Sequence, residues 1–217
     1  DSDMTQRLIG HARALGVKVV TFGRSEGADV RLLDAIAQEN GGSLITADMG
    51  PTRMCYIISE PGEHWIGNSL GVMAAIRAAG GDLASAGLAM AEMCGLKGRG
   101  ARHHVSAAGG KALLIDESYN ANPASMRATL ASLGQTPATR RIVVLGTMGE
   151  LGDFADRFHR QLSKPLADAN IDHAILVGEG MRALAAELVK ASGGQVGFAS
   201  SFTHCDNADQ AITLLND

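Results

Sequence analysis

Polar side chains gather in residues 116–122, directly after a short apolar run at 112–115. The apolar run has the length of a buried strand, and the polar stretch reads Asp116-Glu117-Ser118-Tyr119-Asn120-Ala121-Asn122. Pro123 suits the first position of a helix, with Asn122 as its N-cap. Ligands of α/β sheets bind at the carboxyl ends of strands, so these groups form a candidate site. The residues leave equally open that Asp116 and Asn120 only organise the turn.

Three further residues have side chains suited to a nucleotide. Arg99 lies in the basic, Gly-rich segment 95–104, from which a guanidinium could reach a polyphosphate held between two domains. The alternative for Arg99 is a solvated hinge. His64 and Asn68 are four residues apart and therefore share a helix face, from which they could present polar atoms to a base or a ribose.

Several well-known motifs are absent. The loop 146–152 lies between a predicted strand and helix but is not G-x-G-x-x-G, which argues against a nicotinamide cofactor. Gly109-Gly110-Lys111 lacks the Ser or Thr of a P-loop and leads into a strand, and no G-x-x-x-x-G-K-[ST] occurs anywhere in the sequence. The adjacent side chains of His103 and His104 would point to opposite faces of a strand, so we expect no metal site.

The first half of the chain is predicted to form a helix, a small sheet and two more helices. A helix over 3–15 ends at Gly16, and a strand over 17–22 follows it. Three short strands near 30–35, 43–46 and 54–59 predict an antiparallel meander. A helix that opens in 61–68 has an inward face made of Ile66, Leu70, Met73 and Ile76. The next helix, with Asp82 as its N-cap, continues to Cys94.

The second half shows regular alternation of strands and helices, which predicts an α/β fold with a mostly parallel, doubly wound sheet. The expected strands are 112–115, 141–145, 173–177 and 195–199. The expected helices are 123–133, a helix that carries Phe154, Phe158, Leu162 and Leu166, and then 181–190 and 207–215. Residues 95–104 are rich in Gly and basic groups and have no periodicity, and we expect the boundary between two domains there.

Composition excludes several classes of protein. With 217 residues, 46% hydrophobic and 19% charged, the chain has the size and balance of two globular domains. A net charge of −4 argues against a nucleic-acid surface, and no apolar run approaches the roughly 18 residues of a membrane span. Three cysteines without a CxxC pair favour a reducing compartment. The start, Asp1-Ser2-Asp3-Met4, is not a signal peptide, and we expect both ends to be cut edges of a longer protein.

Four segments, in the same order, resemble the MurF branch of the Mur ligase family. The run from Asp116 to Met126 closely resembles the signature D-[DE]-S-Y-N-A-N-P-x-S-M. Residues 62–68 resemble the helix start G-x-H-N-x-x-N, and Gly98-Arg99 resembles the G-R hinge. Residues 145–152, followed by His159, resemble L-G-D-M-x-E-L-G…H. The resemblance covers nearly the whole chain.

The resemblance implies a cytoplasmic ligase of peptidoglycan synthesis. Such a ligase uses ATP and Mg²⁺ to join UDP-N-acetylmuramoyl-tripeptide to D-alanyl-D-alanine through an acyl phosphate. It also implies the second part of a central ATP-binding domain at 1–97, a hinge at 98–110 and a Rossmann-like C-terminal domain at 111–217. This chain would then lack the P-loop, most magnesium ligands and the last strand, so we expect it to be inactive alone. We expect it to be a monomer.

Functional residues carry over from the family position by position. Asn68 would contact the adenine, Arg99 would reach the ATP phosphates, and Asp116 would hold the ribose or orient the C-terminal domain. The dipeptide or nucleotide side of the cleft would be lined by Tyr119, Asn120 and Asn122, while His64 would brace its helix.

The sequence also departs from the family pattern, and two other classes of function stay open. Trp65 stands where the family often has Asn, and Thr147 replaces the Asp of G-D-M. One alternative is a sister amide ligase of the folylpolyglutamate or cyanophycin type, against which the Tyr-Asn-Ala-Asn-Pro run speaks. The other is a non-catalytic nucleotide-binding or interaction module that kept the fold without the ATPase half.

Overall fold

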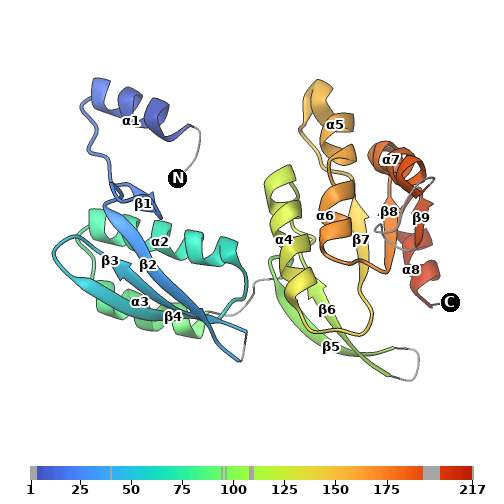
Figure 1. Ribbon diagram of the computed structural model, residues 1–217, viewed down its shortest axis with the longest axis horizontal. Coiled ribbons are helices and arrows are strands. Elements are labelled where there is room, and N and C mark those ends of the chain that lie inside the picture. The colour runs from blue at the N-terminus through green and yellow to red at the C-terminus, as the bar shows by residue number, and fades with distance from the viewer. Residues whose placement is uncertain are drawn as a thin grey trace. The chain divides into compact units, whose positions relative to one another are not determined.

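The structure is a computed structural model that describes residues 4–39, 41–93, 95, 97–107, 110–192 and 201–216. The chain divides into two compact units, Asp1–Leu96 and Lys97–Asp217, and each contains an apolar core of its own. Figure 1 shows the elements of both. No helix among the described residues is long and apolar enough to cross a membrane.

The first unit is a four-stranded sheet with helices on one face. It begins with α1 (Thr5–Ala14), none of whose residues is buried. The sheet has the order β1-β2-β3-β4, and β1 is parallel to β2 while the others are antiparallel. These strands are Phe22–Gly23, Val30–Ala37, Ser43–Asp48 and Arg53–Ile58. The predicted meander is therefore confirmed.

Alternate residues of the sheet pack against α2 (Glu63–Ala78) and α3 (Leu83–Glu92). The core combines strand residues such as Ile45 and Tyr56 with Leu70 and Met73 of α2 and Met90 of α3. The expected Ile76 is only half-buried, and Ala74 is buried in addition. Asp82 caps α3 as predicted, since its carboxylate accepts from the amides of Ala84 and Ser85. Cys94, where that helix was expected to end, lies outside the described residues.

One strand in this unit is shorter than predicted. Of the expected strand 17–22, only Phe22 is in a strand, and Val17 is 55% exposed. The amide and hydroxyl of Thr21 both donate to the Asp29 carboxylate, at 2.8 and 2.7 Å. Because that side chain occupies the Thr21 amide, the ladder with β2 begins only at the next residue.

The second unit contains a parallel sheet with helices on both faces, as predicted. Its strands β7 (Ile142–Gly146), β8 (His173–Val177) and β9 (Ser201–Cys205) are all parallel. One face packs against helices through Leu130, Leu162, Leu166, Leu184 and Leu188, and Ala211 covers Ile175 and Cys205 on the other. The helices are α4 (Pro123–Gln135), α5 (Ala155–Arg160), α6 (Ser163–Asp168), α7 (Arg182–Ser192) and α8 (Ala208–Asn216), with short 3-10 turns η1 (Gly152–Phe154) and η2 (Glu179–Met181).

The segment before α4 differs from the prediction. No strand was expected between the predicted domains, but the structure has β5 (Ala101–Ala107) there. This strand pairs antiparallel with β6 (Gly110–Asp116) in a two-stranded sheet. The run 112–115 was predicted to be a buried strand, yet it lies in a hairpin where Leu114 is 53% exposed. Only one neighbouring strand pairs with β6 among the described residues, so its side chains are not enclosed on both faces.

One further prediction for this unit is wrong, and another falls on residues that the structure does not describe. The single helix predicted through Phe154, Phe158, Leu162 and Leu166 is broken into α5 and α6. Pro165 has no amide hydrogen to donate to the carbonyl of residue 161, and this missing hydrogen bond favours a break before α6. The predicted strand 195–199 lies outside the described residues, and the described strand in this part of the chain is β9.

Candidate functional site

The carboxylate of Asp116, the last residue of β6, is held by backbone and side-chain donors. Its Oδ1 accepts from the Ser118 hydroxyl at 2.6 Å and the Ser118 amide at 3.1 Å. Its Oδ2 accepts from the Gly98 amide at 3.0 Å. The backbone carbonyl of Asp116 accepts from Gly100 at 2.9 Å. Asp116 therefore joins the two ends of the β5–β6 hairpin.

These donors also keep Asp116 charged. The hydrogen bond from the Ser118 hydroxyl lowers the pKa of Asp116 most, followed by the Ser118 amide. Desolvation opposes these two effects, and the Gly98 amide and the charge of His103 lower this pKa by smaller amounts. A carboxylate stabilised in this way is a hydrogen-bond acceptor at neutral pH and not a proton donor.

Arg99 lies next to the Asp116 turn. The Tyr119 amide donates to the Gly98 carbonyl at 3.0 Å, which brings the Tyr119 ring under the Arg99 side chain. The guanidinium carbon of Arg99 is 4.1 Å from the ring centre, within the range of a cation–π contact. Tyr119 remains 67% exposed. Three of the predicted site residues, Arg99, Asp116 and Tyr119, thus meet in the second unit.

The two asparagines of the motif make local hydrogen bonds. Asn120 Oδ1 accepts from the Ala121 amide at 2.8 Å. Asn122 Oδ1 accepts from the amides of Ala124 and Ser125, both at 2.9 Å, and the Ser125 hydroxyl accepts from the Asn122 amide at 3.0 Å. This capping box confirms the predicted N-cap. Both side chains are exposed, and these local bonds use only their Oδ1 atoms and not their NH₂ groups.

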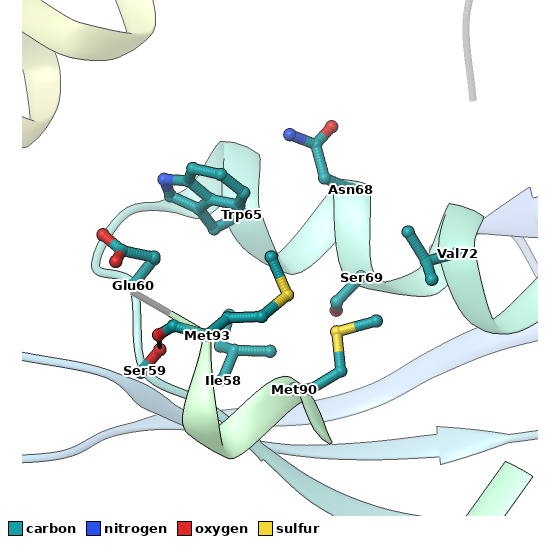
Figure 2. A pocket seen from close by; sticks show the side chains of 9 residues that line it. All are labelled: Ile58, Ser59, Glu60, Trp65, Asn68, Ser69, Val72, Met90 and Met93. Carbon is teal, nitrogen blue, oxygen red and sulfur yellow. Dashed lines mark hydrogen bonds between the residues drawn. The ribbon is translucent and has the colours of Figure 1, made fainter. Parts of the chain in front are cut away.

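Asn68, the remaining predicted residue, belongs to the first unit. It lies at the exposed edge of a shallow pocket of about 40 Å³ between α2, α3 and the end of β4 (Figure 2). The pocket is lined by Ile58, Ser59, Glu60, Trp65, Asn68, Ser69, Val72, Met90 and Met93. His64 is half-buried, and desolvation lowers the pKa of its ring. Its ring centre is 5.6 Å from that of Trp65.

The loop after β7 is organised by a buried histidine. His159 is fully buried; its Nε2 accepts from the Met148 amide at 3.0 Å, while its Nδ1 lies 2.8 Å from the Ala155 carbonyl. Nδ1 therefore carries the proton. Thr147, the departure from the family motif, lies so close to Gly180 that a Cβ there would be 2.5 Å from its methyl group. Thr147 therefore packs against the loop that follows β8.

Some of these residues were missed by the sequence reasoning. Ser118 supplies two of the bonds to Asp116, and the spacing Asp-x-Ser is a turn signal that could have indicated it. Met90 and Met93 line the Asn68 pocket, but no pattern in the sequence relates them to Asn68. Among the residues that the structure describes, no group of three or more His, Cys, Asp or Glu side chains could hold a metal ion.

A protein-family model matches more than half of the chain. The family model described as "Mur ligase, glutamate ligase domain" matches residues 101–217. A UDP-N-acetylmuramoyl-tripeptide–D-alanyl-D-alanine ligase of Rickettsia prowazekii is 33% identical over 115 residues, which are 53% of this chain and 25% of that protein. A UDP-N-acetylmuramate–L-alanine ligase of Streptomyces coelicolor is 32% identical over 143 residues, 66% of this chain and 29% of that protein.

Solved structures give the same fold over more of the chain. A crystal structure of MurF from Acinetobacter baumannii superposes with a TM-score of 0.79 at 25% identity, covering 99% of this chain and 43% of that one. MurF from Thermotoga maritima in complex with ADP has a TM-score of 0.67 at 17% identity, covering 98% and 52%. The chain spans less than a third of the length of these two curated relatives.

Proposed function

Because this chain belongs to the Mur ligase family, we propose that it contributes to an ATP-dependent ligase that joins D-alanyl-D-alanine to UDP-N-acetylmuramoyl-tripeptide in the cytoplasm. The observation that carries this proposal is the turn 116–122. There the complete motif places Arg99 on the Tyr119 ring and fixes the carboxylate of Asp116. The activity for which the Rickettsia relative is named supports the same substrates.

We assign the roles of the second unit from its geometry. The Arg99 guanidinium is exposed and could form two parallel hydrogen bonds with a phosphate. Both oxygens of Asp116 already accept hydrogen bonds, which favours positioning of the turn and acceptance of a ribose hydroxyl over proton transfer. The exposed amides of Asn120 and Asn122 and the hydroxyl of Tyr119 are available to the dipeptide or the nucleotide.

The nucleotide would be ATP, which supplies the phosphoryl group that activates the tripeptide carboxylate. Asn68 would contact its adenine, since the exposed amide makes no hydrogen bond within the part of the chain that the structure describes. The ADP in the Thermotoga structure supports a nucleotide of this kind. The described residues offer no ligand set for Mg²⁺, so we assign no magnesium ligand to them.

The proposed domains follow the family order. Residues 1–97 would be the second part of the ATP-binding domain, 98–110 the connection and 111–217 the C-terminal domain. The sequence has no G-x-x-x-x-G-K-[ST], so these 217 residues alone should not turn over. ATP-dependent ligation by this chain alone would contradict that expectation.

A substrate screen tests the choice of ligase. The Streptomyces relative acts on UDP-N-acetylmuramate and L-alanine by its name and matches more of this chain than the Rickettsia protein does, so it is the main competitor. A longer protein that contains these residues should release phosphate with UDP-N-acetylmuramoyl-tripeptide and D-alanyl-D-alanine, and not with UDP-N-acetylmuramate and L-alanine. The reverse preference would transfer the proposal to the L-alanine-adding type. Folded protein that acts on neither pair would favour the non-catalytic module.

A further inference from the structure

The Tyr119 ring is largely exposed and has a defined contact with one side chain. The guanidinium carbon of Arg99 is 4.1 Å from the centre of the ring. The Tyr119 hydroxyl makes no hydrogen bond with any residue that the structure describes. Tyr119 is 67% exposed and lies outside the apolar core clusters formed by the described residues. The ring therefore contributes little to the core, and its contact with Arg99 is its main interaction.

The turn that brings these two side chains together is built from backbone groups and one carboxylate. The Tyr119 amide donates to the Gly98 carbonyl at 3.0 Å, and the Gly98 amide donates to Asp116 Oδ2, also at 3.0 Å. The Gly100 amide donates to the Asp116 carbonyl at 2.9 Å. These bonds join the residues before β5 to the end of β6, in one hairpin (Figure 1). None of them uses the Tyr119 ring, so the ring can be replaced while the turn is kept.

Arg99 is held without a carboxylate partner among the described residues. Its side chain is exposed, and it lies between Gly98 and Gly100, which are both buried. The nearby carboxylate of Asp116 accepts from Ser118 and Gly98 and not from Arg99. A carboxylate would neutralise the guanidinium and occupy some of its five N–H donors. A ring face attracts the cation through its quadrupole and leaves those donors free.

We propose that Tyr119 is a positioning residue, whose ring holds the Arg99 guanidinium in place for a phosphate of the nucleotide. A flexible arginine loses rotamer freedom when it binds a phosphate, and the ring removes part of this loss in advance. This inference rests on the proposed function, because the phosphate is that of the ATP which the ligase would use. The role belongs to the ring of Tyr119 and does not depend on its hydroxyl.

NMR of this chain with labelled arginine tests the stacking itself. Protons above the face of an aromatic ring resonate upfield, so the side-chain protons of Arg99 should lie upfield of those of Arg102. Arg102 is an exposed arginine of β5 and contacts no ring among the described residues. The upfield shift should persist in Tyr119→Phe and disappear in Tyr119→Leu. Its absence from the folded wild type would overturn the proposal.

The affinity for ATP measures what the stacking contributes. Calorimetry uses a longer protein that contains these residues, with ATP and magnesium but without the other substrates, so that no ligation occurs. Tyr119→Leu should weaken ATP binding by about fivefold, as expected for an exposed cation–π contact, whereas Tyr119→Phe should keep most of the affinity. The matched control is Phe154→Leu, because Phe154 is an exposed ring 4.7 Å from the guanidinium carbon of Arg157. This control should leave the affinity for ATP unchanged.

Two further measurements distinguish positioning of Arg99 from a direct contact of Tyr119 with a substrate. In an Arg99→Ala background, Tyr119→Leu should weaken ATP binding no further, because the ring then has no guanidinium to hold. In the ligase assay, Tyr119→Leu should raise the KM for ATP and leave the KM for D-alanyl-D-alanine unchanged. An additional loss of ATP affinity in the double variant, or equal losses in Tyr119→Phe and Tyr119→Leu, would overturn the proposal.

Failure of this proposal and failure of the ligase proposal give different results. If Tyr119→Leu binds ATP as tightly as the wild type and the longer protein still ligates D-alanyl-D-alanine, only the role of Tyr119 is wrong. If the affinities change as expected and no ligation occurs, the positioning of Arg99 is correct and the proposed reaction is wrong. A folded longer protein that binds no ATP would contradict both proposals.

Discussion

Asp116 shows how one side chain can serve a turn and a binding site together. Both of its oxygens accept hydrogen bonds from Ser118 and Gly98, so the structure confirms the turn-organising role that the sequence left open. A carboxylate can accept further hydrogen bonds beyond these three. The role of Asp116 toward a nucleotide therefore stays a prediction, and its structural role has to be measured separately.

The first prediction concerns the pH dependence of stability. The pKa of Asp116 is lowered in the folded chain, so its contribution to stability is complete above the unfolded value of about 3.9 and is lost as the pH falls through the lower folded value. The difference in unfolding free energy between the wild type and Asp116→Asn should be constant above about pH 5 and shrink toward pH 3. Urea unfolding at each pH measures this difference. Asp29 and Asp82, whose pKa values are also lowered, are common to both proteins. Parallel stability curves would show that Asp116 is not held as described.

The second prediction concerns the backbone at Gly98. Its φ is +72°, and a Cβ there would lie 2.9 Å from both the Tyr119 nitrogen and its Cβ. Gly98→Ala should therefore lower the free energy of unfolding by about 1–3 kcal/mol. The control is Gly149→Ala, where a Cβ would meet nothing within 4 Å, and we expect a change within about 0.5 kcal/mol. Equal effects of the two substitutions in chemical denaturation would argue against the close approach at Tyr119.

At the scale of elements, the capping residues at its N-terminus determine where α4 begins. Asn122 caps it, Pro123 occupies its first position, and Ser125 completes the capping box. The same Asn122 is a candidate for substrate binding. The side-chain Oδ1 of Asn122 accepts the hydrogen bonds of the cap, whereas its side-chain NH₂ group is the part that a ligand could contact.

The third prediction separates these two roles of Asn122. Asn122→Ala should lower the free energy of unfolding by about 1 kcal/mol, because the amides of Ala124 and Ser125 lose their acceptor. Asn122→Asp keeps an acceptor and should be nearly as stable as the wild type. Thermal unfolding of the two variants makes the comparison. In a ligase assay of a longer protein, reduced activity of the stable Asp variant would indicate a role of the NH₂ group, whereas an unstable Asp variant would contradict the capping geometry.

Local sequence signals determined which elements could be predicted. The α4 start and β8 were predicted well, because an N-cap followed by Pro is typical of a helix start, and the apolar run 174–177 is typical of a buried strand. The strand β5 was missed because Arg102, His103 and His104 lack the usual apolar alternation, and its pairing with β6 depends on a partner elsewhere in the chain. The break between α5 and α6 could have been predicted from Pro165. The contact of Arg99 with Tyr119 could not, because it depends on how the two ends of the hairpin meet.

At the scale of the whole molecule, the chain contains two compact units with separate cores. The first is held by the strands β2 to β4 and helices α2 and α3, and the second by the parallel sheet and its helices. The residues proposed to bind the nucleotide belong to both units: Asn68 to the first, and Arg99 and Asp116 to the second. A substitution in one core should therefore be detectable by a probe specific to that unit.

The fourth prediction uses Trp65 as that probe, since it lies in the first unit. Leu184 is fully buried in the core of the second unit, and Leu184→Ala should destabilise this unit by about 2–5 kcal/mol. Far-UV circular dichroism should then show an earlier transition, while the transition in Trp65 emission stays unchanged. Lys190→Ala, at an exposed position of the same helix, should alter neither. A parallel shift of both signals would contradict separate cores.

The central claim is that these residues serve an ATP-dependent D-alanyl-D-alanine ligase, and phosphate release tests it most directly. The assay uses a longer protein that contains this chain, with ATP, magnesium, UDP-N-acetylmuramoyl-tripeptide and D-alanyl-D-alanine, and with the 217-residue chain as a control. We predict release that requires both substrates, is abolished in Arg99→Ala and Asp116→Ala variants that remain folded, and is absent from the control. No release from a folded longer protein, or release unaffected by both substitutions, would contradict this account.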